Sequence, residues 1–191
     1  PLKKKKVQGI DFKKPYLLYV GNAYPHKNLE KLVAAFCQTA SAKENKDLNL
    51  VLVGKPDYFY NRLKKKLLYL PPEIKQRIVF TGFVPDEELF ALYQNAALYI
   101  FPSLYEGFGL PPLEAMACAC PVLSSQATCL PEVLGKAAIY FDPHQASDLR
   151  RKIKQVLADQ KLREALIERG RAQIIRYRWQ EMARQTKALY L

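Results

Sequence analysis

Short hydrophobic runs recur along the chain, and several of them end at a glycine. The first run, YLLYV, stops at Gly21, and a later run, LNLVLV, stops at Gly54. Apolar runs of about four to eight residues with β-branched and aromatic side chains are typical of buried strands. On this pattern we expect six strands, at Tyr16–Val20, Leu48–Val53, Arg77–Thr81, Leu98–Phe101, Pro121–Ser124 and Ala137–Phe141.

The residues between these runs recur at the spacing of amphipathic helices. One such pattern follows the first strand, with Asn28 as its expected N-cap, and another follows the third strand, with Asp86 as its expected N-cap. Tyr58–Leu70 is typical of a basic amphipathic helix that ends at two prolines. This alternation indicates an α/β fold, a Rossmann-like and mostly parallel sheet with helices on both faces.

Beyond Pro143 the pattern changes to three consecutive helices, with breaks near Asp159 and Arg176. The 191 residues are 49% hydrophobic, which suits one domain with a substantial core. No apolar run approaches the ~18 residues that cross a bilayer, and no apolar stretch follows the N-terminal lysines as it would in a signal peptide. We therefore expect a cytoplasmic protein.

The formal net charge of +12 is concentrated in clusters at Lys3–Lys6, at Arg62–Lys66 and after Asp148. Nucleic acids, anionic membrane surfaces and phosphorylated small molecules are all partners that such a charge attracts. A peripheral position at the inner membrane face, through Tyr58–Leu70, is one expectation. A noncatalytic basic module that binds nucleic acid or membranes is the alternative to an enzyme.

Several familiar kinds of site are missing from the sequence. No G-x-G-x-x-G follows the first strand, and neither G-x-x-x-x-G-K-S/T nor G-x-S-x-G occurs. The two histidines, His26 and His144, are far apart, and the four cysteines sit in apolar stretches without a Cys-x-x-Cys pair. We expect reduced thiols, no metal and no cofactor.

The glycines that follow strands mark the edge of the sheet where ligands bind in open α/β folds. Gly21 begins the stretch GNAYPHKN, in which Lys27 is a cation placed at a strand-to-helix turn, as a phosphate requires. Later, EGFGLPPLE places seven residues between Glu106 and Glu114. Its glycines let backbone amides approach a ligand, and its prolines begin a helix with Glu114 in the first turn.

This combination supplies amide donors for phosphates and carboxylate acceptors for hydroxyl groups, which a phosphorylated sugar needs. The stretch EGFGLPPLEAMACACPVLSS resembles the donor-binding signature of the family-four retaining glycosyltransferases, which have the two-domain GT-B fold. The segments YVGNAYPHKNLEKLVAAF, LVLVG and IVFTGFVPDEELFALYQNAALYIFPSLYEGFG are similar to the preceding parts of that family. The resemblance extends from residue 16 to about residue 190.

The resemblance implies an interdomain segment at 1–15, a nucleotide-sugar-binding domain at 16–175 and a C-terminal crossing helix at 176–191. It also implies a separate N-terminal acceptor domain as a partner of this chain, and no nucleic acid. Glu106 and Lys27 would be catalytic, contacting the sugar hydroxyls and the diphosphate. The implied donor-binding residues are Gly21, Asn22, Lys27, Phe83, Val84, Glu106, Gly107, Phe108, Gly109, Leu110 and Glu114.

Within that set, the resemblance gives Glu114 the ribose and gives Phe83 and Val84 the base. Many members of the family have an arginine where this chain has Asn22, which puts the second cationic phosphate contact in question, with His26 or Lys55 as its candidate substitutes. The implied reaction is hexosyl transfer with retention, to a sugar or lipid-linked acceptor, and YPHKN favours GDP-mannose as donor. The chain alone would bind nucleotide but transfer sugar poorly.

A glycogen phosphorylase or epimerase relative of the same architecture is the competing enzyme class. A phosphorylase would carry pyridoxal phosphate on a lysine, and that group absorbs visible light. A nucleic-acid-binding module, in turn, gives no reason for Glu106 and Glu114.

Overall fold

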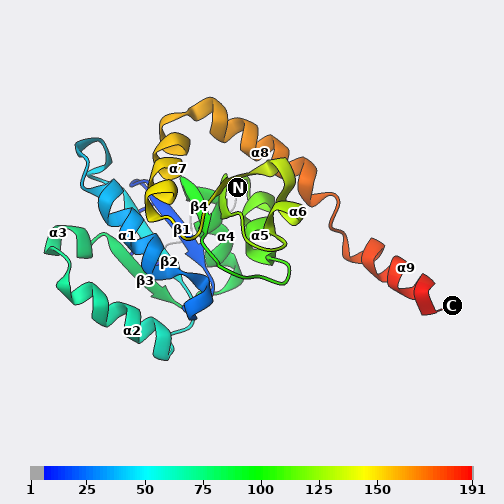
Figure 1. The fold of residues 1–191 in the computed structure, drawn as a ribbon, viewed down its shortest axis with the longest axis horizontal. Coiled ribbons are helices and arrows are strands. Elements are labelled where there is room, and N and C mark those ends of the chain that lie inside the picture. The colour runs from blue at the N-terminus through cyan, green and yellow to red at the C-terminus, as the bar shows by residue number, and fades with distance from the viewer. Residues whose placement is uncertain (1–6, 191) are drawn as a thin grey trace.

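The computed structural model describes residues 7–190, so the cluster Lys3–Lys6 and part of the segment 1–15 lie outside the described residues. Six parallel strands form one sheet in the order β3-β2-β1-β4-β5-β6 (Figure 1). All six predicted strands are confirmed to within one residue at each end. Their bounds are β1 Tyr16–Val20, β2 Asn49–Val53, β3 Ile78–Gly82, β4 Leu98–Phe101, β5 Val122–Ser125 and β6 Ala138–Phe141.

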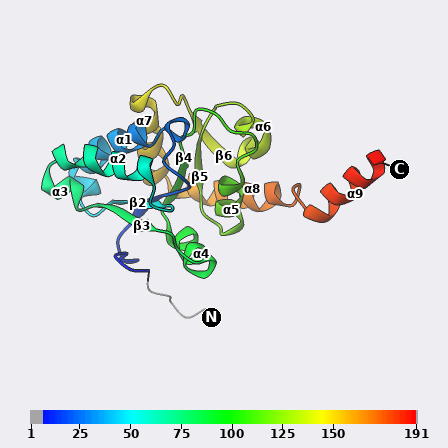
Figure 2. The ribbon, with the colours of Figure 1, turned by 90° about the horizontal axis from the view of Figure 1, so that it is seen from below.

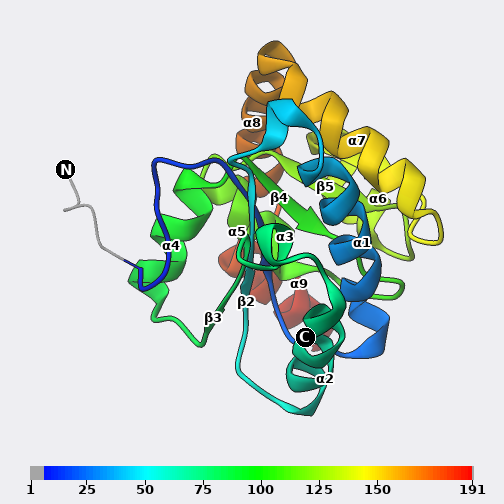
Figure 3. The same cartoon turned by 90° about the vertical axis from the view of Figure 1, so that its left-hand side faces the viewer.

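Helices cover both faces of this sheet, which confirms the predicted Rossmann-like fold class. Figures 2 and 3 show α1 and α7 on one face and α4 on the other, and Figure 2 places α5 beside α4. The three C-terminal helices are also present. The helices are α1 Leu29–Ala40, α2 Tyr58–Lys66, α3 Pro72–Lys75, α4 Asp86–Asn95, α5 Leu110–Ala117, α6 Leu130–Leu134, α7 Ala146–Ala158, α8 Gln160–Ile174 and α9 Trp179–Tyr190.

The central strands are the most buried part of the molecule. Leu17, Leu18, Tyr99 and Ile100 are all 0% exposed, because helices cover both sides of a parallel sheet. Tyr16 is also buried, and its hydroxyl donates a 2.6 Å hydrogen bond to the Leu92 carbonyl. The hydrophobic runs that predicted strands are therefore the core itself.

Of the two predicted N-caps, one is wrong by one residue and the other is confirmed in position. Asp86 is the first residue of α4, and Pro85 occupies the N-cap position, so the predicted cap is wrong by one residue. Asn28 is the N-cap of α1 as predicted, but its φ of 60° is left-handed, and its side chain bonds other segments and makes no capping hydrogen bond. Asp57 is an N-cap that the sequence analysis missed, and its carboxylate accepts a hydrogen bond from the Tyr60 amide.

The order of the strands reverses between β1 and β4. The chain runs from β1 outward through β2 to β3 and then returns to form β4 on the other side of β1. Ligands of open parallel sheets bind at such a reversal, beyond the carboxyl ends of the two strands. A ligand site is therefore expected at the loops after β1 and β4.

Helix α9 stands apart from the rest of the chain. It extends away from the sheet in Figures 1 and 2, and none of its described residues is buried. No helix in residues 7–190 combines the length and apolar character that a membrane span needs.

Candidate functional site at the carboxyl edge of the sheet

The loop after β1 begins at a glycine that the local packing requires. Gly21 has a φ of 148°, and a Cβ there would lie 2.7 Å from the Tyr19 hydroxyl oxygen. The Gly21 carbonyl accepts a 2.8 Å hydrogen bond from Tyr60, and a Cβ on Gly54 would lie 2.1 Å from that carbonyl oxygen. The glycines after the first two strands thus let their loops pack against each other.

Asn22 follows Gly21, and its hydrogen bonds are with residues two or three positions away. Its backbone carbonyl accepts a hydrogen bond from the Tyr19 hydroxyl at 2.7 Å, and its side-chain oxygen accepts one from the Tyr24 amide. The chain then forms a short 3₁₀ turn at Pro25–Lys27. Asn22 shapes the turn that carries Lys27, and this is a role that the sequence analysis had not assigned to it.

Three hydrogen bonds tie this turn to neighbouring loops, two to the loop after β4 and one to the loop after β6. The Leu104 amide donates to the His26 carbonyl at 2.7 Å, and the Asn28 side-chain amide donates to the carbonyls of Pro102 and Pro143. Asn28 is only 9% exposed, so the two hydrogen bonds of its side chain are shielded from water. The two loops at the strand reversal therefore hold a fixed relative position.

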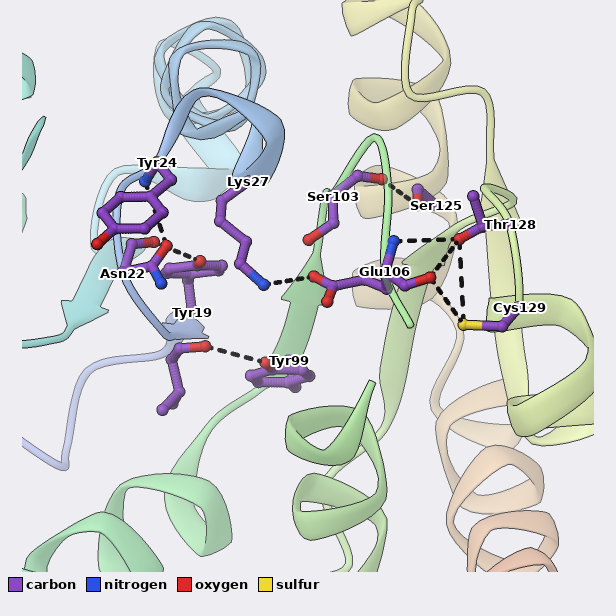
Figure 4. A network of polar contacts seen from close by, with 11 residues as sticks. Tyr19, Asn22, Tyr24, Lys27, Tyr99, Ser103, Glu106, Ser125, Thr128 and Cys129 are labelled. Carbon is purple, nitrogen blue, oxygen red and sulfur yellow. Dashed lines mark hydrogen bonds and ion pairs between the residues drawn. The ribbon is translucent and has the colours of Figure 1, made fainter. Parts of the chain in front are cut away.

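Lys27 and Glu106 meet across the strand reversal. The Lys27 Nζ atom donates to Glu106 Oε1 at 2.6 Å, and the side chains are 15% and 12% exposed (Figure 4). Lys27 also lies 5.6 Å from the centre of the Phe101 ring. The two residues that the sequence analysis named as catalytic are brought together in the structure, where they neutralise each other.

The Glu106 carboxylate also affects the pKa of the buried Tyr19 hydroxyl. Burial raises the pKa of Tyr19 well above its ordinary value, and the neighbouring Tyr60 and the Glu106 carboxylate raise it further. Tyr19 thus stays protonated, and its hydroxyl remains a donor to the Asn22 carbonyl.

The backbone of Glu106 is held by residues that the sequence analysis missed. The Glu106 amide donates to the Thr128 hydroxyl oxygen at 3.1 Å, and this hydroxyl and the Cys129 thiol reach the Glu106 carbonyl (Figure 4). Thr128 has a φ of 49°, which is rare for a residue with a β-branched side chain. No local sequence motif predicts this contact, because Glu106 and Thr128 are 22 positions apart.

The stretch after Glu106 presents unpaired amide groups. The N–H groups of residues 107–110 have no hydrogen-bond acceptor among residues 7–190. Gly109 has a φ of 90°, and a Cβ there would lie 2.7 Å from Leu130 Cδ2, so the site needs a glycine. These free donors at the start of α5 form an edge that suits an anion.

Glu114 lies elsewhere than the sequence analysis expected. Helix α5 begins at Leu110, directly after Gly109, so Glu114 belongs to the second turn and the first-turn assignment is wrong. Its Oε2 accepts a 3.0 Å hydrogen bond from the Tyr93 hydroxyl. Burial first, and then the Glu114 carboxylate, raises the pKa of Tyr93 far above its ordinary value.

Glu114 opens onto a groove of about 770 Å³ between α5 and α9. Phe108 and Leu110 also line this groove, whereas Lys27 and Glu106 do not. Phe108 packs edge-on against Tyr177, with ring centres 5.4 Å apart. The predicted set is thus divided between the ion pair at the strand reversal and the wall of this groove.

Phe83 and Val84 follow β3, two strands away from β1. Phe83 is 75% exposed, whereas Val84 is buried in the core. Among residues 7–190 no hydrogen bond, ion pair or ring contact joins Phe83 to the other predicted residues. The structure places Phe83 at the same edge of the sheet without bringing it into contact with them.

These features define a class of protein. A doubly wound parallel sheet with glycine-ended strands, a cation at the strand reversal and free amides beside a carboxylate is a ligand-binding α/β domain. The family described as Glycosyl transferases group 1 matches residues 2–173. The chain belongs to this family.

Individual relatives agree with this assignment. The chain is 38% identical to O-antigen chain mannosyltransferase B of Escherichia coli over 178 residues, which cover 92% of this chain and 45% of that protein. It is 35% identical to serotype-specific mannosyltransferase WbdA of Escherichia coli, covering 88% of this chain and 20% of that protein. The chain therefore spans less than half the length of these curated relatives.

Solved structures place the fold in the same group. Sucrose-phosphate synthase from Thermosynechococcus elongatus superimposes with a TM-score of 0.82 and 30% identity, covering 95% of this chain and 46% of that one. The C-terminal domain of a glycosyl transferase group 1 protein (LpcC) from Francisella tularensis has the same fold, with a TM-score of 0.72 and 24% identity. The architecture is the Rossmann-like C-terminal half of a GT-B glycosyltransferase.

The ion pair between Lys27 and Glu106 is open to a direct test. We expect a double-mutant cycle with Lys27→Met and Glu106→Gln to give a coupling free energy of about 1–3 kcal/mol in denaturant unfolding. Removing one partner leaves the other charge in a largely dehydrated position.

The matched control is the surface pair Arg171 and Glu168, whose side chains are 60% and 69% exposed. Exposed pairs of this kind couple by about 0.5 kcal/mol or less. A coupling between Lys27 and Glu106 that is no larger than in this control would contradict the account.

Proposed function

We propose that this chain is the donor-binding domain of a retaining glycosyltransferase, and that the strand reversal between β1 and β4 holds a nucleotide-diphosphate sugar. The observation that carries the proposal is the Lys27–Glu106 pair beside the free amides of residues 107–110. A diphosphate needs a cation and N–H donors, and a sugar needs acceptors for its hydroxyl groups. The site supplies each of these within two adjoining loops.

In the proposed reaction Lys27 and the amides of residues 107–110 bind the diphosphate and stabilise the charge that develops as it leaves. Preorganised donors of this kind contribute strongly in a site that excludes water. The leaving diphosphate accepts the proton of the acceptor hydroxyl, and the sugar is transferred with its anomeric configuration retained. Glu106 accepts hydrogen bonds from sugar hydroxyls, Glu114 binds the ribose, and the loop with Phe83 and Val84 lies against the base.

The names of the relatives support mannose as the transferred sugar. The relatives named above, and the O-antigen chain mannosyltransferase RfbU of Salmonella typhimurium at 33% identity, are named as mannosyltransferases. We propose GDP-mannose as the donor and a sugar or lipid-linked acceptor. The relatives are longer than this chain, so we also propose that an acceptor domain outside it completes the enzyme and that the chain alone transfers little sugar.

A calorimetric titration of the chain with GDP, UDP, ADP and GDP-mannose tests the proposal. We expect selective binding of GDP and GDP-mannose over the other two nucleotides. Lys27→Ala should weaken the binding of GDP by about tenfold or more, because it removes a charge-assisted contact. Glu114→Ala should weaken it as well, through the ribose.

The matched control is Lys31→Ala, which removes a lysine on α1 whose ammonium group bonds the His144 carbonyl. This variant should bind GDP like the unaltered chain. Failure of all four nucleotides to bind would contradict the proposal. Binding that Lys27→Ala does not weaken would mean that the nucleotide binds away from Lys27.

Two highly exposed tyrosines favour an anionic membrane surface as a second partner. Tyr58 and Tyr69 are 71% and 92% exposed, although large aromatic side chains are usually buried. They lie at the two ends of a stripe that follows α2 and the turn after it, on the side opposite the buried Tyr60 and Leu63. The stripe, spaced by four, three and four residues, consists of Tyr58, Arg62, Lys65 and Tyr69.

Tyrosines beside cations suit the headgroup region of an anionic bilayer. We propose that this stripe rests on a membrane that bears the lipid-linked acceptor. In sedimentation with vesicles that contain phosphatidylglycerol, the double variant Tyr58→Ser/Tyr69→Ser should bind about fivefold more weakly than the unaltered chain.

The control is Tyr105→Ser, which alters a tyrosine that is 67% exposed outside the stripe. Equal binding by the double variant and the unaltered chain, or binding that does not need the anionic lipid, would contradict this proposal.

A further inference from the structure

Ser103 carries a buried polar group beside the site that has no role so far. The residue lies in the loop after β4 and is 0% exposed. Its hydroxyl oxygen has no hydrogen-bond partner among residues 7–190. Buried hydroxyl groups nearly always have partners, because an unpaired one costs free energy. An unpaired hydroxyl next to a ligand site suggests a partner that arrives in another state of the site.

The backbone around Ser103 is fixed from two sides. Its carbonyl accepts a 2.6 Å hydrogen bond from the Ser125 hydroxyl, and the next amide, of Leu104, donates to the His26 carbonyl. Figure 4 shows the Ser103 hydroxyl pointing from this loop toward the ion pair of Lys27 and Glu106. The Ser103 hydroxyl is therefore an unused hydrogen-bond donor beside the Glu106 carboxylate, which already accepts a hydrogen bond from Lys27.

Glu106 needs such a donor as soon as Lys27 leaves it. Its side chain is 12% exposed, so water cannot fully replace the ammonium group. Thr128 and Cys129, which also contact Glu106, are already engaged with its backbone atoms. Among the hydroxyl and thiol groups of Ser103, Ser125, Thr128 and Cys129 in Figure 4, the Ser103 hydroxyl is the one without a hydrogen-bond partner among residues 7–190.

We infer that Lys27 and Ser103 exchange as partners of Glu106. When Lys27 turns to a diphosphate, the Ser103 hydroxyl donates to the Glu106 carboxylate and keeps it aimed at the sugar hydroxyls. Ser103 is thus a positioning residue, because it acts through Glu106. The link to a diphosphate rests on the proposed function, whereas the exchange itself depends only on the contacts among Lys27, Ser103 and Glu106.

Thermal unfolding of four proteins without ligand tests the exchange: the unaltered chain, Ser103→Ala, Lys27→Met and the double variant. In the unaltered background, Ser103→Ala should leave the Tm unchanged or raise it, since it removes an unpaired buried hydroxyl. In the Lys27→Met background Glu106 takes Ser103 as its donor, so the same substitution should lower the Tm by about 2–4 °C.

Ser124→Ala is the matched control, because Ser124 is equally buried and its hydroxyl donates to the Ser125 carbonyl at 3.0 Å. It should lower the Tm by a similar amount in both backgrounds. A lower Tm for Ser103→Ala in the unaltered background, or no added loss in the Lys27→Met background, would overturn the exchange.

A titration with GDP-mannose measures what the exchange does for the ligand. Ser103→Ala should weaken its binding about tenfold, the loss expected for one hydrogen bond to a charged group. The same substitution should have no effect in a Glu106→Ala background, and an equal loss in both backgrounds would overturn the positioning role. If the unaltered chain binds no nucleotide sugar, the proposed function fails, while the unfolding experiment still decides the exchange.

Discussion

The reversal of strand order between β1 and β4 is the constraint on which the site depends. Parallel strands on either side of a reversal send their next segments to opposite faces of the sheet, which leaves a crevice between the two loops. Here Leu17 and Leu18 of β1 pair with Leu98 and Tyr99 of β4. This pairing lies deep in the core, so it fixes the separation of the two loops. Lys27 and Glu106 meet because the sheet brings them together.

Lys27 and Glu106 balance each other's charge at the strand reversal. The Lys27 ammonium group and the Glu106 carboxylate satisfy each other, while the amides of residues 107–110 have no acceptors among the described residues. A ligand with a negative group and hydroxyl groups can engage all of these atoms, but only by opening the ion pair. In the proposed site, the cost of opening this pair would favour ligands that offer an anion to Lys27, because a ligand without one gains nothing in return.

The sequence predicted the sheet well because its signals are local. Each strand is an apolar run that ends at a glycine, a proline or a polar residue, so all six were located to within a residue. The pairing of Lys27 with Glu106 could not be read from the sequence, because the two are 79 positions apart. Thr128, Asn28 and Ser103 were missed as parts of the site for the same reason. Glu114 was misplaced because α5 begins at Leu110, one residue before the prolines, with Gly109 as its N-cap.

The most direct test of the account is a crystal structure of this chain with GDP-mannose, in which the distance between Lys27 Nζ and Glu106 Oε1 is measured. That distance is 2.6 Å in the structure described above. The account predicts that it exceeds ~3.5 Å, with Lys27 on the diphosphate and Glu106 on the sugar. An intact ion pair, with the nucleotide bound at another surface, would contradict it.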